Sequence, residues 1–348
     1  MTHQVGYCAG FQKWERRCRY LACTHPLLYS VRTQKIIGAG DQFPELAKSD
    51  NYKLVPCGQC ISCRIARSKA WACRNVLENL DSEESCFVTL TYEPGKVPII
   101  NHYTGEVGRG QSGIIDQGQI VQNLTLWPED VQKFIKRLRR RYEYHEGKKL
   151  RYYYAGEYGP TTLRPHYHLL LYNYVPRDLE FWKVHNEQNW FLSKELAETW
   201  GMGFVSVGLI TYQSAAYVAR YTTKKLYGEE GKQRQQELGL IPEFSRMSLK
   251  PGIGAKYYDE NKDTIYKFDK IILPGEKAKV VKPPKFFDDK YKNEHPYEYG
   301  IIKAERERIA KEQEAVRSSK STLDYFSQLR VIEENTQKKL MALVRPLE

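Results

Sequence analysis

The chain has 348 residues, of which 41% are hydrophobic, with a formal net charge of +12 and a pI of about 9.1. This length suits one large domain or two smaller ones, and the hydrophobic content excludes a globally disordered chain. No stretch approaches the roughly 18 apolar residues of a membrane span, so we expect no membrane partner, whereas the basic charge and the 26 tyrosines suit a nucleic acid.

The N-terminal region contains all eight cysteines, between Cys8 and Cys86. The densest group is Cys57-Gly-Gln-Cys60-Ile-Ser-Cys63, whose spacing favours a metal site in a reducing compartment over disulfides. A tetrahedral zinc site needs a fourth ligand, and the candidates are Cys23, which we favour, Cys8, Cys18 and His25. We therefore expect a zinc-knuckle-like region over residues 1–85 of a cytoplasmic protein, with buried free thiols as the alternative.

The next segments are expected to be a helix, a strand and a loop. Residues 64–80 combine an apolar side with the basic residues Arg64, Arg67 and Arg74, which either contact phosphates or cover an ordinary solvated helix face. Residues 86–92 alternate and are rich in strand formers, which predicts a strand. Residues 93–124 show little periodicity, and we expect a long loop or an irregular hairpin there.

The clearest helical pattern covers residues 128–144. Pro128 lies near its start, and Glu129 and Asp130 suit the positive end of the helix dipole. Apolar residues then recur from Val131 at helical spacing, which predicts one buried face.

Two strand-like runs follow, and they flank the turn-rich residues 159–165. Side chains alternate along a strand, so His166 and His168 share one face and Tyr167 points to the other. Two imidazoles on one face are good ligands for a divalent metal, and Glu157 can add an oxygen ligand if the runs pair as an antiparallel hairpin. The alternative is that these histidines only mark an exposed strand face.

A third group of candidate residues lies on a helix expected over residues 212–227, after a short helix at 192–200 and a strand at 203–210. Tyr217 and Tyr221 are four residues apart and share one helix face with Lys224. Two tyrosines at this spacing can be ordinary half-buried packing. Beside a metal site, however, a tyrosine hydroxyl can attack a phosphodiester and keep the 5′ end as a phosphotyrosine. Because Lys224 lies one turn beyond it, Tyr221 is the expected first nucleophile.

These motifs resemble the HUH endonuclease superfamily, named for His–hydrophobe–His, here His166-Tyr167-His168. Residues 87–92 are similar to the first motif of that superfamily and residues 217–224 to its third. The tyrosine pair resembles the replication initiators of the microviruses, small single-stranded DNA phages. The cysteine motif, GEYGPTTLRPHYH and MSLKPGIG (247–254) are together most similar to the gokushovirus branch. The resemblance covers roughly residues 20–260.

The resemblance implies an α+β fold with a central antiparallel sheet flanked by helices, of the HUH, ferredoxin/RRM-like kind. It implies a metal-dependent DNA endonuclease that nicks the origin of a small phage, starts rolling-circle replication and rejoins the ends. The implied metal ligands are Glu157, His166 and His168, with Mg²⁺ or Mn²⁺ as the catalytic ion and Zn²⁺ as the structural one. The implied catalytic residues are Tyr217, Tyr221 and Lys224. The implied partners are single-stranded origin DNA and the polymerase and helicase of a bacterial host, in whose cytoplasm the protein would act.

We expect four segments: the cysteine-rich region 1–85, a nickase core over 86–230, an extension packing on the core over 231–300, and a charged, partly helical tail over 301–348. The arginines expected to bind nucleic acid are Arg64, Arg67, Arg74, Arg164 and Arg220. Two other interpretations remain open. One is a relaxase or transposase with the same chemistry, and the other is a non-catalytic zinc-knuckle protein that binds nucleic acid.

Overall fold

The computed structural model describes residues 23–101, 103–110, 115–116, 119–120, 122–159, 163–185, 187–224, 239–275 and 278–342. Its internal contacts form two units, which we describe separately. The sheet unit comprises Arg67–Lys262 and Pro284–Asp289, and the cysteine unit comprises 23–66, Asp263–Pro283 and 290–342. The four-segment division expected from the sequence stays a prediction, because these units are defined by contact density and not by independent folding.

The sheet unit is built on an antiparallel sheet of seven strands. In spatial order they are β12 (Glu180–His185), β13 (Gln188–Leu192), β14 (Val205–Gly208), β4 (Ser85–Thr91), β11 (Pro165–Tyr172), β10 (Arg151–Tyr158) and β15 (Phe244–Met247). The histidine-bearing strand β11 lies inside the sheet, between β4 and β10. Backbone groups of β11 are therefore bonded on both sides, which holds its side chains in a fixed register.

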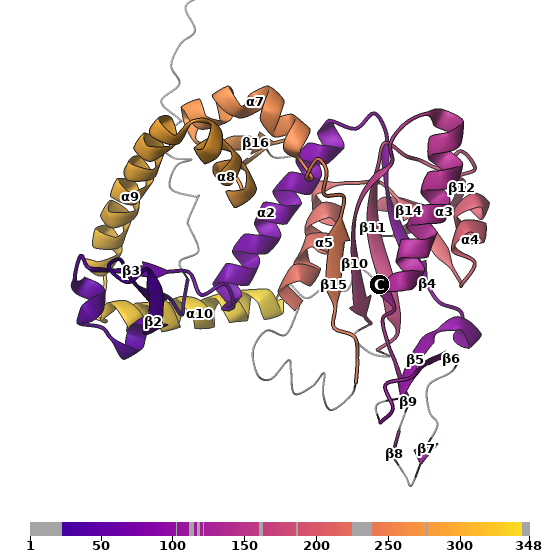
Figure 1. Cartoon of the computed structure of the whole chain (residues 1–348), viewed down its shortest axis with the longest axis horizontal. Coiled ribbons are helices and arrows are strands. Elements are labelled where there is room, and N and C mark those ends of the chain that lie inside the picture. The colour runs from indigo at the N-terminus through magenta and orange to yellow at the C-terminus, as the bar shows by residue number, and fades with distance from the viewer. Residues whose placement is uncertain are drawn as a thin grey trace, which may run out of the picture. The chain divides into compact units, whose positions relative to one another are not determined.

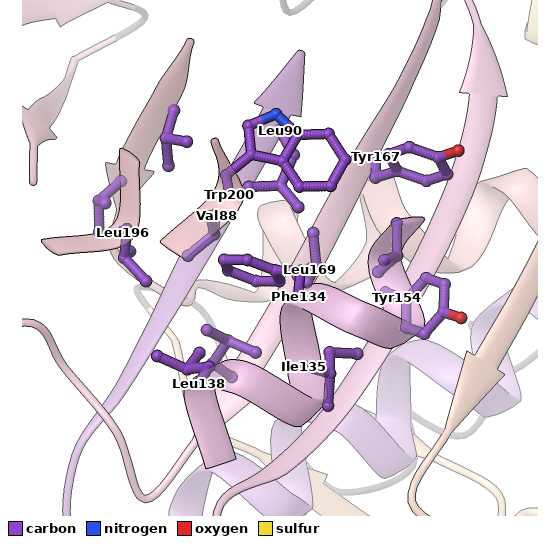
Figure 2. Close-up of a cluster of buried hydrophobic side chains, with 14 of the residues drawn as sticks. Val88, Leu90, Phe134, Ile135, Leu138, Tyr154, Tyr167, Leu169, Leu196 and Trp200 are labelled. Carbon is purple, nitrogen blue, oxygen red and sulfur yellow. The ribbon is translucent and has the colours of Figure 1, made fainter. Parts of the chain in front are cut away.

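Helices flank this sheet on both faces, with α3 (Pro128–Glu146) and α4 (Lys194–Trp200) on one and α5 (Tyr212–Lys224) on the other (Figure 1). The α+β fold class expected from the sequence is thus confirmed. The main core lies under α3 and α4, where Leu90, Tyr167 and Leu169 meet Phe134 and Trp200 (Figure 2). All of these side chains are at most 1% exposed, and each contributes about 1.5–3 kcal/mol to folding. The alternate residues of the same strands face α5.

Most elements of the sheet unit lie within a few residues of their expected bounds. The expected strand at 86–92 is β4, and the expected helices at 128–144, 192–200 and 212–227 are α3, α4 and α5. The region 93–124 is an exception, because short strands replace much of the expected loop. They are β5 (Pro98–Asn101), β6 (Val107–Arg109), β7 (Ile115–Asp116), β8 (Gln119–Ile120) and β9 (Gln122–Leu124), preceded by η3 (Pro94–Lys96). Strands of two to four residues show too little alternation for a sequence pattern to reveal them.

Three helices have residues in both units: α2 (Ile61–Leu80), α7 (Ala255–Phe268) and α8 (Lys285–Glu294). The sequence predicts α2 but not α7 or α8. Within the sheet unit, Tyr258 of α7 packs on Phe287 of α8, with ring centroids 5.3 Å apart.

The cysteine unit contains a three-stranded antiparallel sheet in the order β2 (Lys35–Ala39), β1 (Leu27–Ser30), β3 (Tyr52–Val55). Its other elements are η1 (Gly40–Gln42), η2 (Leu46–Lys48), the pair β16 (Ile271–Leu273) and β17 (Lys279–Val281), α9 (Pro296–Ser318) and α10 (Tyr325–Ala342). Helix α10 buries Gln328 and Leu329, whereas α9 buries no residue. Among the helices of the described residues, none is long and apolar enough to cross a membrane.

Candidate active site

The central feature of the sheet unit is a carboxylate bound by two imidazoles. Glu157 on β10 lies directly opposite His166 on β11, because these neighbouring strands pair as an antiparallel hairpin. Oε1 of Glu157 is 2.6 Å from Nε2 of His166 and 3.0 Å from Nε2 of His168. The hairpin pairing expected from the sequence is therefore present, and it brings the three expected ligand residues together.

The outer nitrogens of both imidazoles are held as well. Nδ1 of His166 lies 3.1 Å from the carbonyl oxygen of Arg164, which can only accept a hydrogen bond, so the ring proton is on Nδ1. Nδ1 of His168 lies 3.1 Å from the hydroxyl of Thr89, and Phe87 stacks on the ring of His168. Because its Nδ1 carries the proton, the Nε2 lone pair of His166 faces Glu157, which is the arrangement of a metal-ligating histidine.

This cluster fits a divalent metal ion. Its three ligand atoms lie within 4.8 Å of one another, with one hard oxygen and two imidazole nitrogens. Burial by itself would raise the pKa of the Glu157 carboxyl, but the hydrogen bonds with His166 and His168 outweigh burial and hold that pKa well below its usual range. The carboxylate is therefore charged at neutral pH, as a metal ligand must be.

Helix α5 presents Tyr217 to this cluster. Its start is stabilised by reciprocal bonds between Thr211 and Ser214, and it packs on β10, β11 and β15 through Ala215, Val218 and Ala219. The Tyr217 hydroxyl lies 3.4 Å from Oε1 of Glu157. Its ring meets that of His168 edge-on, with centroids 5.1 Å apart. One carboxylate oxygen thus contacts two imidazoles and a phenol.

The other expected residues of α5 are Arg220, Tyr221 and Lys224. Their backbone belongs to the helix, and their side chains lie outside the described part of the structure. Tyr221 follows Tyr217 by one turn, as the helical spacing requires.

The expected cysteines also come together, in the cysteine unit. The sulfur atoms of Cys23, Cys57, Cys60 and Cys63 all lie within 4.8 Å of one another. The hydrogen bond with Cys23 lowers the pKa of the Cys60 thiol to about 3, whereas the pKa of Cys23 is raised above its usual range, first by the same bond and then by burial. Of the alternative ligands, His25 instead contacts Glu333, and Cys8 and Cys18 lie outside the described residues.

The expected DNA-binding arginines differ in their surroundings. The guanidinium of Arg74 lies over the rings of Trp71 and Phe286, and its Nε donates to the carbonyl of Ile253; burial lowers its pKa to about 10. Arg164 donates to the carbonyl of Tyr92 beside the histidine cluster. Arg64 and Arg67 are half-buried on α2.

Sequence reasoning missed an aromatic group on the sheet face that carries His166 and His168. Phe204 precedes the core residue Val205, so it points away from the core, and it lies beside Thr91. Its ring packs against Trp182, and the ammonium group of Lys183 lies 4.1 Å from the centre of the Trp182 ring. Phe204 and Trp182 are 45% and 41% exposed, respectively, which is unusual for such large apolar rings.

Comparisons with known proteins identify the family. Residues 85–226 match the family model of the replication-associated proteins of the ORF2 type. The chain is 36% identical over 303 residues to "Replication-associated protein ORF2" of Spiroplasma virus 4, covering 84% of each chain. It is 27% identical over 277 residues to "Replication-associated protein VP4" of Bdellovibrio phage phiMH2K, covering 78% of each.

A third relative, "Replication-associated protein ORF4" of Chlamydia phage 1, is 30% identical over 176 residues, which are 49% of this chain and 38% of the relative. No solved structure is significantly similar to the chain. The extent of the first match, over most of both chains, establishes the relationship. The chain belongs to the ORF2-type family of replication-associated proteins, whose members include those of small phages.

Proposed function

We propose that this protein is the replication initiator of a small single-stranded DNA phage, and that it nicks the origin through a 5′-phosphotyrosine intermediate, as HUH endonucleases do. The observation that carries the proposal is the shared contact of Tyr217, His166 and His168 with one oxygen of Glu157. A nucleophile and a metal-ligand set are thereby within one hydrogen bond of each other. Family membership supports a role in rolling-circle replication.

In this proposal, Glu157, His166 and His168 bind Mg²⁺ or Mn²⁺, which supplies Lewis-acid polarisation of the scissile phosphate when bound. The three protein ligands leave coordination positions for the substrate. Arg164 and Thr89 hold the two imidazoles in orientation.

Tyr217 is the proposed first nucleophile, in place of the Tyr221 expected from the sequence, because its hydroxyl already contacts the ligand set. Its phenol loses a proton and forms a bond to phosphorus. The bond from phosphorus to the 3′ oxygen breaks, and that oxygen takes up a proton to become a free 3′ hydroxyl. The energy of the broken ester is retained in the tyrosyl ester, so no nucleotide hydrolysis is needed.

Tyr221 is the proposed second nucleophile. It lies one turn along the same helix face, so a small movement of α5 or of the DNA can exchange the two phenols at the phosphate. A second cut by Tyr221 would allow the first end to be rejoined. Lys224 is the proposed phosphate contact in the next turn.

The exposed aromatic group suggests where the single strand lies. Helix α5 packs on the β10, β11 and β15 side of the sheet, whereas Phe204 and Trp182 are exposed toward the β12 edge of the same face. Bases stack on exposed aromatic rings, and Lys183 can contact a phosphate. We propose that the strand runs from the scissile phosphate at Glu157 across Phe204 to Trp182.

After the nick, the free 3′ hydroxyl would prime a host polymerase, with a host helicase opening the duplex in the bacterial cytoplasm. The test is incubation of single-stranded oligonucleotides covering the phage origin with purified protein and Mn²⁺, followed by denaturing gel electrophoresis. The proposal expects a protein-linked 5′ fragment and a free 3′ hydroxyl fragment. Tight binding without a covalent product would favour the non-catalytic alternative, and cleavage of a transfer-origin or transposon-end oligonucleotide instead would favour the relaxase or transposase alternative.

A further inference from the structure

The cysteine cluster lies where two paired strands of the cysteine unit end. Strand β1 follows Cys23 and strand β3 precedes Cys57, and the register pairs Leu27 with Val55. Antiparallel pairing therefore brings Cys23 next to Cys57, although they are 34 residues apart. Cys60 lies just before α2, and Cys63 lies in its first turn.

The distances between the sulfurs match a metal centre and not disulfides. Cys23 Sγ is 3.5 Å from Cys57 Sγ and 3.7 Å from Cys60 Sγ, far longer than a disulfide bond of roughly 2.05 Å. Tetrahedral zinc, with Zn–S bonds of about 2.3 Å, spaces its sulfurs roughly 3.8 Å apart. The four thiols are therefore close to the positions that zinc requires.

Backbone N–H groups point at the sulfurs, as they do around metal-bound thiolates. The N–H groups of Gln59 and Cys60 point at Cys57 Sγ, at 3.4 and 3.2 Å, and the N–H of Cys57 points at Cys23 Sγ at 3.3 Å. The turn depends on Gly58, whose φ of 75° is in the left-handed region that favours glycine. This turn is preorganised for negative charge on sulfur.

The residues next to Cys23 hold the C-terminal helix α10. The hydroxyl of Thr24 donates to Oε1 of Glu333 at 3.1 Å, and Nε2 of His25 lies 2.6 Å from Oε2 of the same carboxylate. Thr24 is buried, and it also interacts with the sulfur of Cys60. One carboxylate on α10 is thus bound by the two residues that follow a cysteine of the cluster.

We propose that Cys23, Cys57, Cys60 and Cys63 bind one structural Zn²⁺, and that the bound ion keeps Thr24 and His25 in position to hold α10 through Glu333. Without the ion, weak contacts among the thiols replace the Zn–S bonds that fix Cys23 to the turn at Cys57. Residues 23–25 then move, and α10 loses both bonds to its carboxylate. The zinc site therefore joins the beginning of the described chain to its last helix, a role separate from DNA cleavage.

The test combines metal analysis with hydrogen exchange of the full chain. Purified protein should contain about one zinc per chain, by the four-ligand rule. Removal of zinc by a mercurial and a chelator should speed amide exchange over residues 325–339 by about tenfold or more, since charge-assisted bonds to Glu333 are lost. Glu333→Gln should keep its zinc and show the same faster exchange of α10. The matched control is Glu334→Gln, the exposed neighbour, which should change neither.

Cys60→Ser should lose zinc and, where it folds, show the faster exchange as well. Iron instead of zinc, or disulfides among the four cysteines of freshly purified protein, would overturn the assignment. Unchanged exchange of α10 in zinc-free protein would overturn the link to the helix. Both readouts are independent of nicking, so failure of this proposal and failure of the proposed function can be told apart.

Discussion

The hydroxyl of Tyr217 lies 3.4 Å from Oε1 of Glu157, the carboxylate oxygen that His166 and His168 also contact. The tyrosine comes from a helix on one face of the sheet, and the other three residues come from two neighbouring strands. The contact means that helix α5 and the hairpin β10–β11 must hold their relative position for the site to exist. The predictions below test the metal ligands, their support, the DNA path, one buried carboxyl and the nucleophile.

The metal ligands are tested by removing one imidazole at a time. His166→Ala and His168→Ala should each abolish cleavage of origin DNA and leave most DNA binding intact, because the basic phosphate contacts lie elsewhere. Wild-type protein in excess chelator should behave in the same way. The control is His185→Ala, a half-buried histidine on β12, which should cleave normally. Full cleavage by either ligand variant, or by chelated wild type, would refute the metal-dependent mechanism.

Support of the ligands is tested at Thr89. Thr89→Val keeps the shape of the side chain and removes the hydroxyl that contacts Nδ1 of His168. Loss of such an outer contact should weaken Mn²⁺ binding by about 10–100-fold, measured by calorimetric titration. Ser206→Ala is the matched control, because Ser206 lies beside Thr89 on the next strand. Equal Mn²⁺ affinity of Thr89→Val and wild type would show that the contact does not orient the ligand.

The DNA path is tested on the exposed aromatic rings. Trp182→Ala and Phe204→Ala should each weaken binding of a single-stranded origin oligonucleotide by about 1–3 kcal/mol, the contribution of one stacked base. Phe181→Ala is the control, because Phe181 is also exposed on β12 but packs against Phe191, which borders the core on the opposite face. Fluorescence anisotropy measures all three. The path is wrong if Phe181→Ala weakens binding as much as the other two variants.

The pH dependence of stability is tested at Asp81, at the end of α2. Burial first, and then the nearby charge of Glu260, raises the pKa of this carboxyl to about 6. Since this value exceeds the unfolded pKa of roughly 3.9, ionisation of Asp81 costs stability as the pH rises from about 4 to about 6. Asp81→Asn should therefore stabilise the protein by about 1 kcal/mol at pH 7, after allowance for solvent screening, and by little below pH 4. Urea unfolding at both pH values checks this, and an equal effect at the two would contradict it.

The metal cluster could be predicted from sequence because it is local. Glu157 and His166 lie on consecutive strands joined by a short turn, so strand alternation and hairpin pairing are enough to bring them together. The cysteine cluster was predictable from spacing for three members. Cys23 was chosen among alternatives, and the pairing of β1 with β3 is what brings it to the others.

The supporting and aromatic residues could not be predicted, since they depend on pairing between distant strands. Thr89 reaches His168 because β4 pairs with β11, 79 residues further along the chain. Trp182 meets Phe204 only because β12, β13 and β14 form a meander with a bulge between Phe181 and Lys183. A bulge reverses the side-chain alternation, so a period of two cannot show which face Trp182 joins.

The central claim is that Tyr217 attacks the scissile phosphate. Its most direct test is formation of the covalent adduct on origin oligonucleotides by wild type, Tyr217→Phe, Tyr221→Phe and the double variant, with peptide mapping of the linked residue. The account predicts a Tyr217 adduct in wild type and in Tyr221→Phe, little first-cut adduct in Tyr217→Phe, impaired cut-and-rejoin in both single variants, and no product from the double variant. An adduct on any residue other than these two tyrosines, or strand transfer at the wild-type rate by Tyr217→Phe, would contradict it.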